Sequence, residues 1–165
     1  TQLLIWLIGL GWVAHALNAH WNEPALLTGA LWAGTALAAT PTEAPPAAEI
    51  AQRLACPASP NCVNSLGVGG LPPLAYTGSA EQGLARLRAT LTGFGEARIE
   101  ADDGQSITAI FTTLLGFRDE VVFVLDPAQP VIHFRSRSLL GYHDFGKNRA
   151  RMQAVSERFA ATPQP

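Results

Sequence analysis

A run of four strand-like segments between residues 97 and 138 is the feature that most constrains the fold. ARIEA at residues 97–101 is followed by the turn signal DDG and then by QSITAIFTTL at residues 105–114. GFRDEVVFVLD at residues 116–126 is separated by PAQP from VIHFRSRS at residues 131–138. Short connections between successive strands are typical of an antiparallel meander. The sequence therefore predicts a four-stranded antiparallel sheet.

Two helical patterns flank these strands. The first begins with a capping-box pattern at Ser79 and Gln82 and continues with leucines spaced by three or four residues, at Leu84, Leu87 and Leu91. The second begins near Asp144, which we expect to be the N-cap, and has an apolar stripe at Met152, Val155 and Phe159. The order of helix, four strands and helix predicts an α+β fold with both helices on one face of the sheet.

The first forty residues differ from the rest of the chain in charge. Residues 2–39 contain no Lys, Arg or Asp and one acidic residue, Glu23. Two apolar runs, residues 3–19 and 25–39, flank the polar stretch HWNEP, and each is shorter than the roughly 20 residues that span a bilayer. We interpret this segment as a membrane anchor, either a hairpin of two short helices or one spanning helix followed by an interfacial helix. The alternatives are a cleaved signal peptide and a buried pair of soluble helices.

The stretch TPTEAPPAAEIAQR, which is rich in Pro and Ala, follows the apolar segment. It has little to bury and indicates a semi-extended linker. We therefore divide the chain into an anchor at residues 1–40, a linker at residues 41–53 and a soluble domain at residues 54–165.

Cys56 and Cys62 are the two cysteines of the chain, in the stretch CPASPNC. The intervening prolines favour a turn that brings the sulfurs together, and an isolated pair in a membrane-tethered domain predicts a disulfide on the oxidising side of the membrane. Reduced or metal-linked cysteines are the alternatives. Zinc would need two further ligands at finger spacing, and a redox motif would have two intervening residues.

Charge is distributed unevenly along the chain. Residues 1–130 hold five basic and eleven acidic side chains, whereas residues 131–165 hold six basic and two acidic ones. This asymmetry indicates either a local anionic partner or pairing with acidic residues of the same domain. It is too small for a nucleic-acid-binding protein, which needs a basic surface over many phosphates.

Most of the basic residues near the C-terminus lie in RSRSLLGYHDFGKNRAR. In an extended strand His133, Arg135 and Arg137 share one face, while Ser136 and Ser138 share the other. The preceding strand offers neighbours for the arginines at Arg118, Asp119 and Glu120.

The helix after this strand begins with an electrostatic misfit. Its first two turns carry basic residues, although cations at a helix N-terminus oppose the helix dipole. Either internal carboxylates or a bound anion must compensate. The stretch is therefore interpreted as a polar brace or an anion-binding site, and its further members are Tyr142, Asp144, Asn148, Arg149 and Arg151.

Three motifs together resemble the family called domain of unknown function 1499. They are CPASPNCVNS, LLGFRDEVVF and RSRSLLGYHDFGKNRAR, and the resemblance covers residues 54–160. It implies a domain that is often tethered to a membrane, and it implies no particular activity.

The residue types of a hydrolase triad occur in the last motif, as Ser136 or Ser138 with His143 and Asp144. There is no nucleophile-elbow motif, and adjacent residues do not orient one another for catalysis. His133, His143 and Asp144 could in principle bind a metal, but three such ligands are common by chance. We therefore expect neither catalysis nor a metal site.

The apolar segment carries one candidate cofactor ligand. GWVAHALNAHW resembles the pigment-binding helix of light-harvesting antenna polypeptides, in which a histidine coordinates bacteriochlorophyll. The resemblance implies His15 as that ligand, with Gly11 one turn earlier. The alternative is that His15 and His20 bond to neighbouring helices or lie near the interface, in which case no cofactor is expected.

These observations favour a non-enzymatic, membrane-anchored accessory subunit in the bacterial inner membrane. Its periplasmic or lumenal domain would dock on a larger membrane protein complex, and a photosynthetic complex is one candidate. One alternative is a domain that binds a lipid headgroup or another small anion through Arg135, Arg137, Arg149 and Arg151. The second alternative is a hydrolase.

Overall fold

A computed structural model describes residues 47–163 of the chain. The predicted membrane anchor, His15 and the start of the predicted linker lie outside the described residues. Within residues 47–163, no helix is long and apolar enough to cross a membrane.

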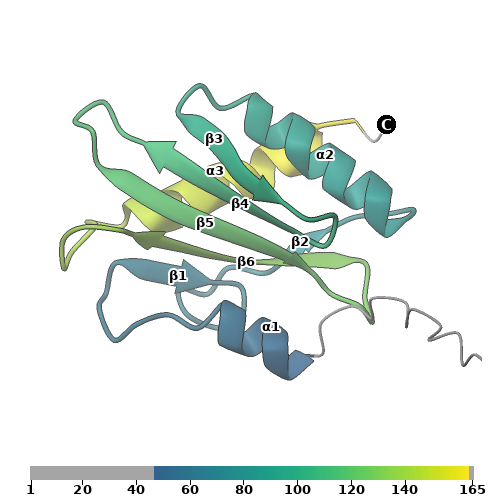
Figure 1. Ribbon diagram of the computed structural model, residues 1–165, viewed down its shortest axis with the longest axis horizontal. Coiled ribbons are helices and arrows are strands. Elements are labelled where there is room, and N and C mark those ends of the chain that lie inside the picture. Colours follow the sequence, from purple (N-terminus) through teal and green to yellow (C-terminus); the bar gives the residue numbers. More distant parts are fainter. Residues whose placement is uncertain (1–46, 164–165) are drawn as a thin grey trace, which may run out of the picture. The chain divides into compact units, whose positions relative to one another are not determined.

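The described domain is built on a six-stranded antiparallel sheet in an α+β fold (Figure 1). The four expected strands are present as β3 (Ala97–Asp102), β4 (Ser106–Thr112), β5 (Arg118–Leu125) and β6 (Val131–Ser138). The prediction of four strands is nevertheless wrong, because β1 (Cys62–Asn64) and β2 (Leu74–Ala75) both pair with β6. These two strands are too short to show the alternation of apolar and polar residues by which strands are recognised in a sequence.

One face of the sheet packs against α2 (Ala80–Thr92) and α3 (Lys147–Ala161), as the sequence predicts. Phe111, Phe123 and Phe134, one from each of the three central strands, are completely buried there. The capping box at the start of α2 is confirmed, with Ser79 and Gln82 bonded reciprocally. The apolar stripes of the two helices close the core with Leu84, Leu87, Leu91, Met152, Val155 and Phe159.

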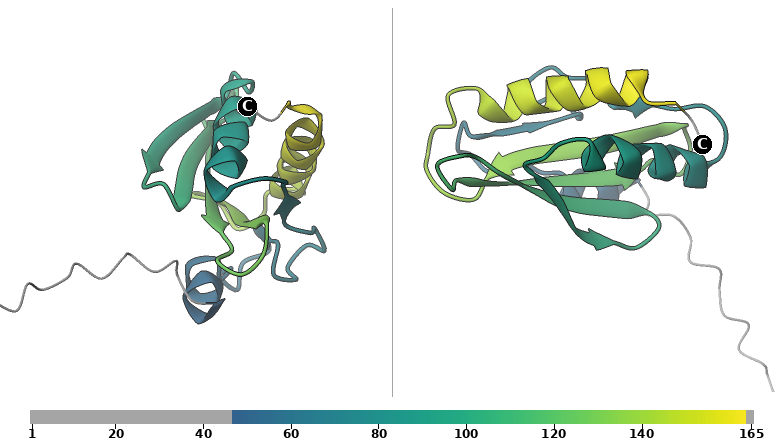
Figure 2. Two further views of the ribbon diagram at one scale, coloured as in Figure 1. Left: turned by 90° about the vertical axis from the view of Figure 1, so that its right-hand side faces the viewer. Right: turned by 90° about the horizontal axis from the view of Figure 1, so that it is seen from above.

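The opposite face is partly covered by a third helix, α1 (Ala47–Arg53), where we expected semi-extended linker. Its segment is rich in Ala, Glu, Gln and Arg, which are good helix formers. Ile50 and Leu54 are buried against Val122 and Val124 of β5, the residues that alternate with its core-facing side chains. Figure 2 shows α1 separated from α2 and α3 by the strands. The compact domain therefore begins earlier than residue 54.

One edge of the sheet is β3, whose pairing with β4 shifts register between Ile99 and Ala101. Its exposed side chains are mostly charged. Asp102 pairs with Arg88 of α2, and Glu100 pairs with Arg118 at the start of β5. This edge of the sheet therefore carries charged side chains and a β-bulge, and it is not a flat apolar strand.

Candidate functional site

Glu120 joins two arginines on the face of the sheet that carries α1. Its Oε1 atom accepts a hydrogen bond from Arg135 Nη2 at 2.7 Å and another from Arg137 Nε at 2.9 Å. Arg135 also donates through Nη1 to the backbone carbonyl groups of Arg53 and Ala55, at 3.0 and 3.3 Å. These bonds tie the end of α1 to β5 and β6.

A second ion pair lies on the other face, between β5 and α3. Arg151 Nη2 donates to Asp119 Oδ2 at 2.5 Å, and the two side chains are only 10% and 5% exposed. The guanidinium also lies over the ring of Phe111, with 5.0 Å between Cζ and the ring centroid. Because both charges are shielded from water, each depends on the other for compensation.

Asn148, which is completely buried, connects α3 to the last strand and to the segment before β1. Its Oδ1 atom accepts hydrogen bonds from Ser136 Oγ at 2.6 Å and from Arg151 Nη1 at 3.1 Å. Its Nδ2 group lies within hydrogen-bond distance of three acceptors, namely the carbonyl oxygen of Asn61, Ser138 Oγ and Asp144 Oδ2. An amide side chain has two N–H donors and one acceptor oxygen, so every hydrogen-bonding group of the Asn148 side chain has a partner.

The start of α3 differs from the prediction. Gly146, in the left-handed region at φ 78°, occupies the N-cap position that we expected Asp144 to fill. Asp144 still supplies the carboxylate, since Oδ2 accepts from the backbone N–H of Asn148 at 2.8 Å and Oδ1 from that of Gly146 at 3.1 Å. Burial acts to raise the pKa of Asp144, but hydrogen bonds from Asn148 and Gly146 outweigh it, so the pKa is lowered. The carboxylate thus compensates part of the misfit at this helix start.

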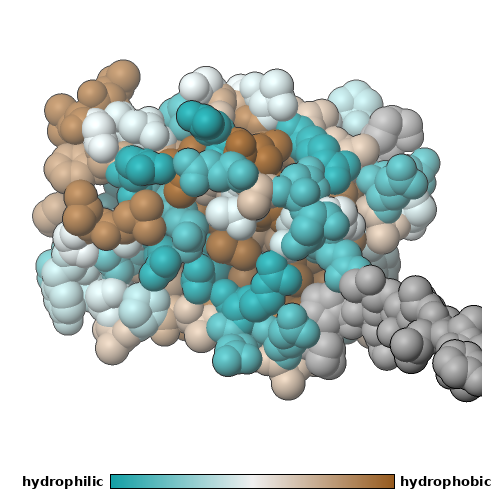
Figure 3. Space-filling view, in the orientation of Figure 1, coloured by the Kyte–Doolittle hydropathy of each residue, from teal (hydrophilic) through white to brown (hydrophobic). Residues whose placement is uncertain are grey.

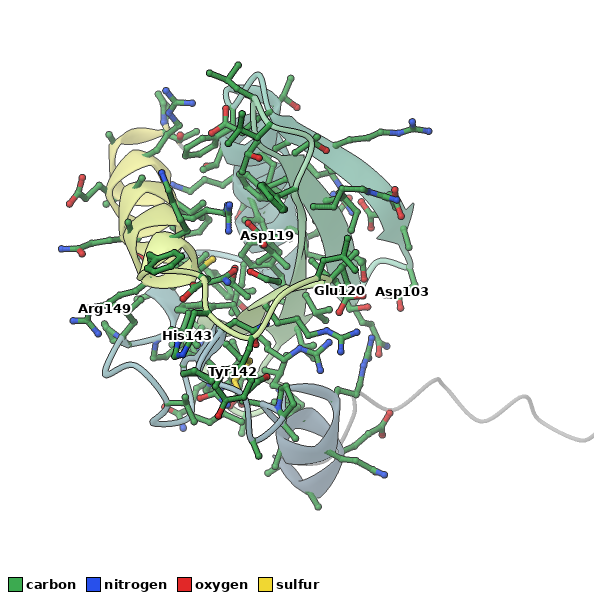
Figure 4. All side chains as sticks on the ribbon, turned by 90° about the vertical axis from the view of Figure 1, so that its left-hand side faces the viewer. Asp103, Asp119, Glu120, Tyr142, His143 and Arg149 are labelled. Atoms are coloured by element: carbon green, nitrogen blue, oxygen red, sulfur yellow. A yellow bond between two sulfur atoms is a disulfide. The ribbon has the colours of Figure 1, made fainter. Side chains whose placement is uncertain are left out.

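Two cationic side chains of the motif make no hydrogen bond or ion pair within the described domain. Lys147 and Arg149 are both exposed at the beginning of α3. Figure 4 shows Arg149 projecting outward from the helix, away from Asp119 and Glu120. Arg135, Arg137 and Arg151 are therefore ion-paired within the described domain, and Arg149 is not.

The residues considered for the alternative of a hydrolase triad do not assemble into one. Ser136 is buried and donates to Asn148, and Ser138 accepts from the same side chain. The ring of His143 packs edge-on against the exposed Tyr142, with centroids 4.8 Å apart. Neither serine has a general base beside it.

A different Ser–His–Asp arrangement does occur, and sequence reasoning missed it. His133 Nδ1 lies 3.1 Å from Ser65 Oγ, and His133 Nε2 lies 3.1 Å from Asp126 Oδ2. Ser65 Oγ also accepts a hydrogen bond from the backbone N–H of Phe134 at 3.0 Å. Burial acts to raise the pKa of Asp126, but bonds from the β5–β6 turn and from His133 lower it overall. No motif indicated this arrangement, because Ser65 lies 68 residues before His133 in the chain.

The predicted disulfide is confirmed between Cys56 and Cys62, with 2.07 Å between the sulfurs. An open pocket of about 530 Å³ lies beside it, and its lining includes Val68, Asp144 and Arg149. In the described part of the chain, no group of three His, Cys, Asp or Glu side chains could hold a metal ion.

Large apolar side chains gather at one end of the domain, and sequence reasoning missed this surface as well. They come from the β4–β5 loop and the β6–α3 loop, which are adjacent because the Leu139 N–H donates to the Arg118 carbonyl at 3.0 Å. Figure 3 shows hydrophobic residues on this side of the molecule, at the left. We call the six most exposed the apolar end: Leu114, Leu115, Phe117, Leu140, Tyr142 and Phe145. Apolar residues in predicted turns, in LLGF and LLGYHDF, were the available signal.

A scan against family models matches residues 54–159 to the protein of unknown function family DUF1499. The chain belongs to this family. The resemblance seen in the three motifs is thereby confirmed over most of the described domain. Comparison with curated proteins gave no match.

Proposed function

We propose that this DUF1499 protein is a non-enzymatic, membrane-anchored accessory subunit of a larger membrane protein complex. One observation carries the proposal. Three of the four arginines of the most distinctive motif are bonded to carboxylates of β5 inside the domain. Glu120 pairs with Arg135 and Arg137, and Asp119 pairs with Arg151. These three arginines therefore hold the domain together and are not available to a substrate.

The Ser65–His133–Asp126 arrangement does not change this conclusion. Its geometry would suit an activated serine, since a neutral His133 that donates from Nε2 to Asp126 can accept from Ser65. However, His133 and Asp126 are each only 14% exposed, and Ser65 Oγ is bound by a backbone N–H. These features support a role in holding β6 to the β1–β2 loop and to the β5–β6 turn.

Location and attachment are supported from two directions. The apolar residues 2–39, with Glu23 as their one acidic residue and no Lys, Arg or Asp, favour a membrane anchor. The Cys56–Cys62 disulfide favours an oxidising compartment, the periplasm or a lumen. The apolar end supports contact between the domain and another apolar surface. A photosynthetic complex as partner, and bacteriochlorophyll at His15, remain proposals from the sequence.

A second candidate is a domain that binds a lipid headgroup or a small anion. The observation in its favour is the pairing of an open pocket with Arg149, which has no partner in the described domain. Arg135 and Arg137, which we also considered for this role, are engaged by Glu120.

Purification of the intact chain from native membranes in mild detergent tests the proposal. We expect the chain to migrate with a large complex and to lose that association when residues 1–40 are deleted. A chain that migrates alone with a bound phospholipid would favour the second candidate, and Arg149→Ala should then release the lipid. Labelling of Ser65 by a fluorophosphonate, abolished in His133→Ala, would contradict the non-enzymatic proposal.

A further inference from the structure

The apolar end consists of protruding loop tips rather than a groove. Leu114 is 107% exposed, Phe145 96% and Leu115 85%. The β4–β5 loop is nevertheless an ordered turn, in which the N–H groups of Gly116 and Phe117 donate to Thr113 at 2.9 and 3.1 Å. The side chains are thus held out from the domain by bonded backbone. Protruding apolar side chains of this kind mark a surface that contacts something other than water.

Charge around the apolar end is one-sided. The two loops contain one carboxylate, Asp144, and both of its oxygens accept hydrogen bonds from the start of α3. Lys147 and Arg149 are exposed beside it and have no ionic partner in residues 47–163. A surface of apolar tips bordered by free cations is complementary to an anionic lipid bilayer, which buries Leu, Phe and Tyr below its headgroups and attracts Lys and Arg at their level.

We propose that the apolar end inserts into the interfacial layer of a lipid bilayer. This inference rests on the proposed membrane anchor and adds a second point of attachment to it. Separate protruding tips suit a fluid bilayer, which needs no matching shape, whereas a protein partner would need complementary pockets.

A fluorescent label at the apolar end of the full chain tests this proposal. Because both natural cysteines form the disulfide, Leu115→Cys offers a single reactive thiol for an environment-sensitive dye such as nitrobenzoxadiazole. The chain is reconstituted into vesicles of phosphatidylcholine with phosphatidylglycerol. We expect quenching by lipid-borne doxyl groups and protection from aqueous iodide. Gln153→Cys, at an exposed position of α3, is the matched control and should show the reverse.

The outcomes separate this inference from the proposed function. A Leu115 label that iodide quenches as strongly as the Gln153 label, on a chain that stays with the vesicles, would overturn insertion and leave the anchor intact. A chain that does not stay with vesicles would overturn the anchor itself. If the Leu115 label is protected from iodide in native membranes but not in vesicles of pure lipid, the apolar end contacts a protein partner and not the bilayer. Lys147→Gln with Arg149→Gln should weaken protection in vesicles with phosphatidylglycerol more than in phosphatidylcholine alone.

Discussion

Replacing Arg151 with alanine should strongly destabilise the domain, because it leaves the carboxylate of Asp119 buried without a counter-ion. The two side chains are 10% and 5% exposed, which places the pair among buried ion pairs rather than surface ones. Removing one partner of such a pair costs about 3–5 kcal/mol. A domain of this size loses roughly 4 °C of melting temperature per kcal/mol, so we expect a decrease of about 12–20 °C. Thermal unfolding of residues 41–165, followed by circular dichroism, measures it.

Arg149→Ala is the matched control, since Arg149 is the same residue type on the same helix and has no partner within the described domain. We expect its effect on the free energy of unfolding to stay within about 0.5 kcal/mol. Replacing both members of the buried pair, as Asp119→Leu with Arg151→Met, should recover most of the loss, because no charge is then left unpaired. If Arg151→Ala melts at the same temperature as Arg149→Ala, the interpretation of the motif as a structural brace is wrong.

Three further results are expected. Mass spectrometry of the unreduced protein should find no free thiol, and two free thiols would remove the argument for an oxidising compartment. Reduction of the disulfide, whose cysteines are 6 residues apart in sequence, should lower the free energy of unfolding by about 2 kcal/mol. The pKa of Asp144 is lowered in the folded state, so the carboxylate contributes fully to stability above its unfolded pKa of about 4, and this contribution is lost as the pH falls through the folded pKa. The Asp144→Asn variant should therefore lose less stability in acid than the parent. An acid transition that is the same in both proteins would contradict this. Residues 41–165 should fold without residues 1–40, whereas aggregation or loss of secondary structure in circular dichroism would show that the domain boundary is wrong.

Local sequence patterns predicted the parts of this fold that depend on periodicity. The four long strands, the capping box at Ser79 and the apolar stripes of α2 and α3 each repeat a signal over several residues. β1 and β2 were missed because each becomes a strand only when β6 lies beside it. The helix at Ala47–Arg53 was missed because nearby prolines suggested an extended chain, while the partners of Ile50 lie about seventy residues away in β5.

In the candidate site too, the sequence predicted what depends on local periodicity and missed what depends on distant parts of the chain. Strand alternation correctly separated Arg135 and Arg137 from Ser136 and Ser138, and the register of β5 against β6 then made Glu120 the partner of both arginines. No sequence rule could give Asn148 its central place, because its neighbours come from three separate segments. The exposure of the apolar end was equally hidden, since a leucine in a turn can be buried or exposed depending on what packs against it.

The charged, bulged edge at β3 limits how copies of this domain can associate. A sheet whose last strand is flat and apolar can recruit a further strand from another chain, which is the route to fibres and domain swapping. Here an arriving strand would meet Arg98 and Glu100 and a register shift at Ile99, while the other side of β6 is already occupied by the short β1 and β2. Crowding many copies together should therefore not polymerise the sheet through β3.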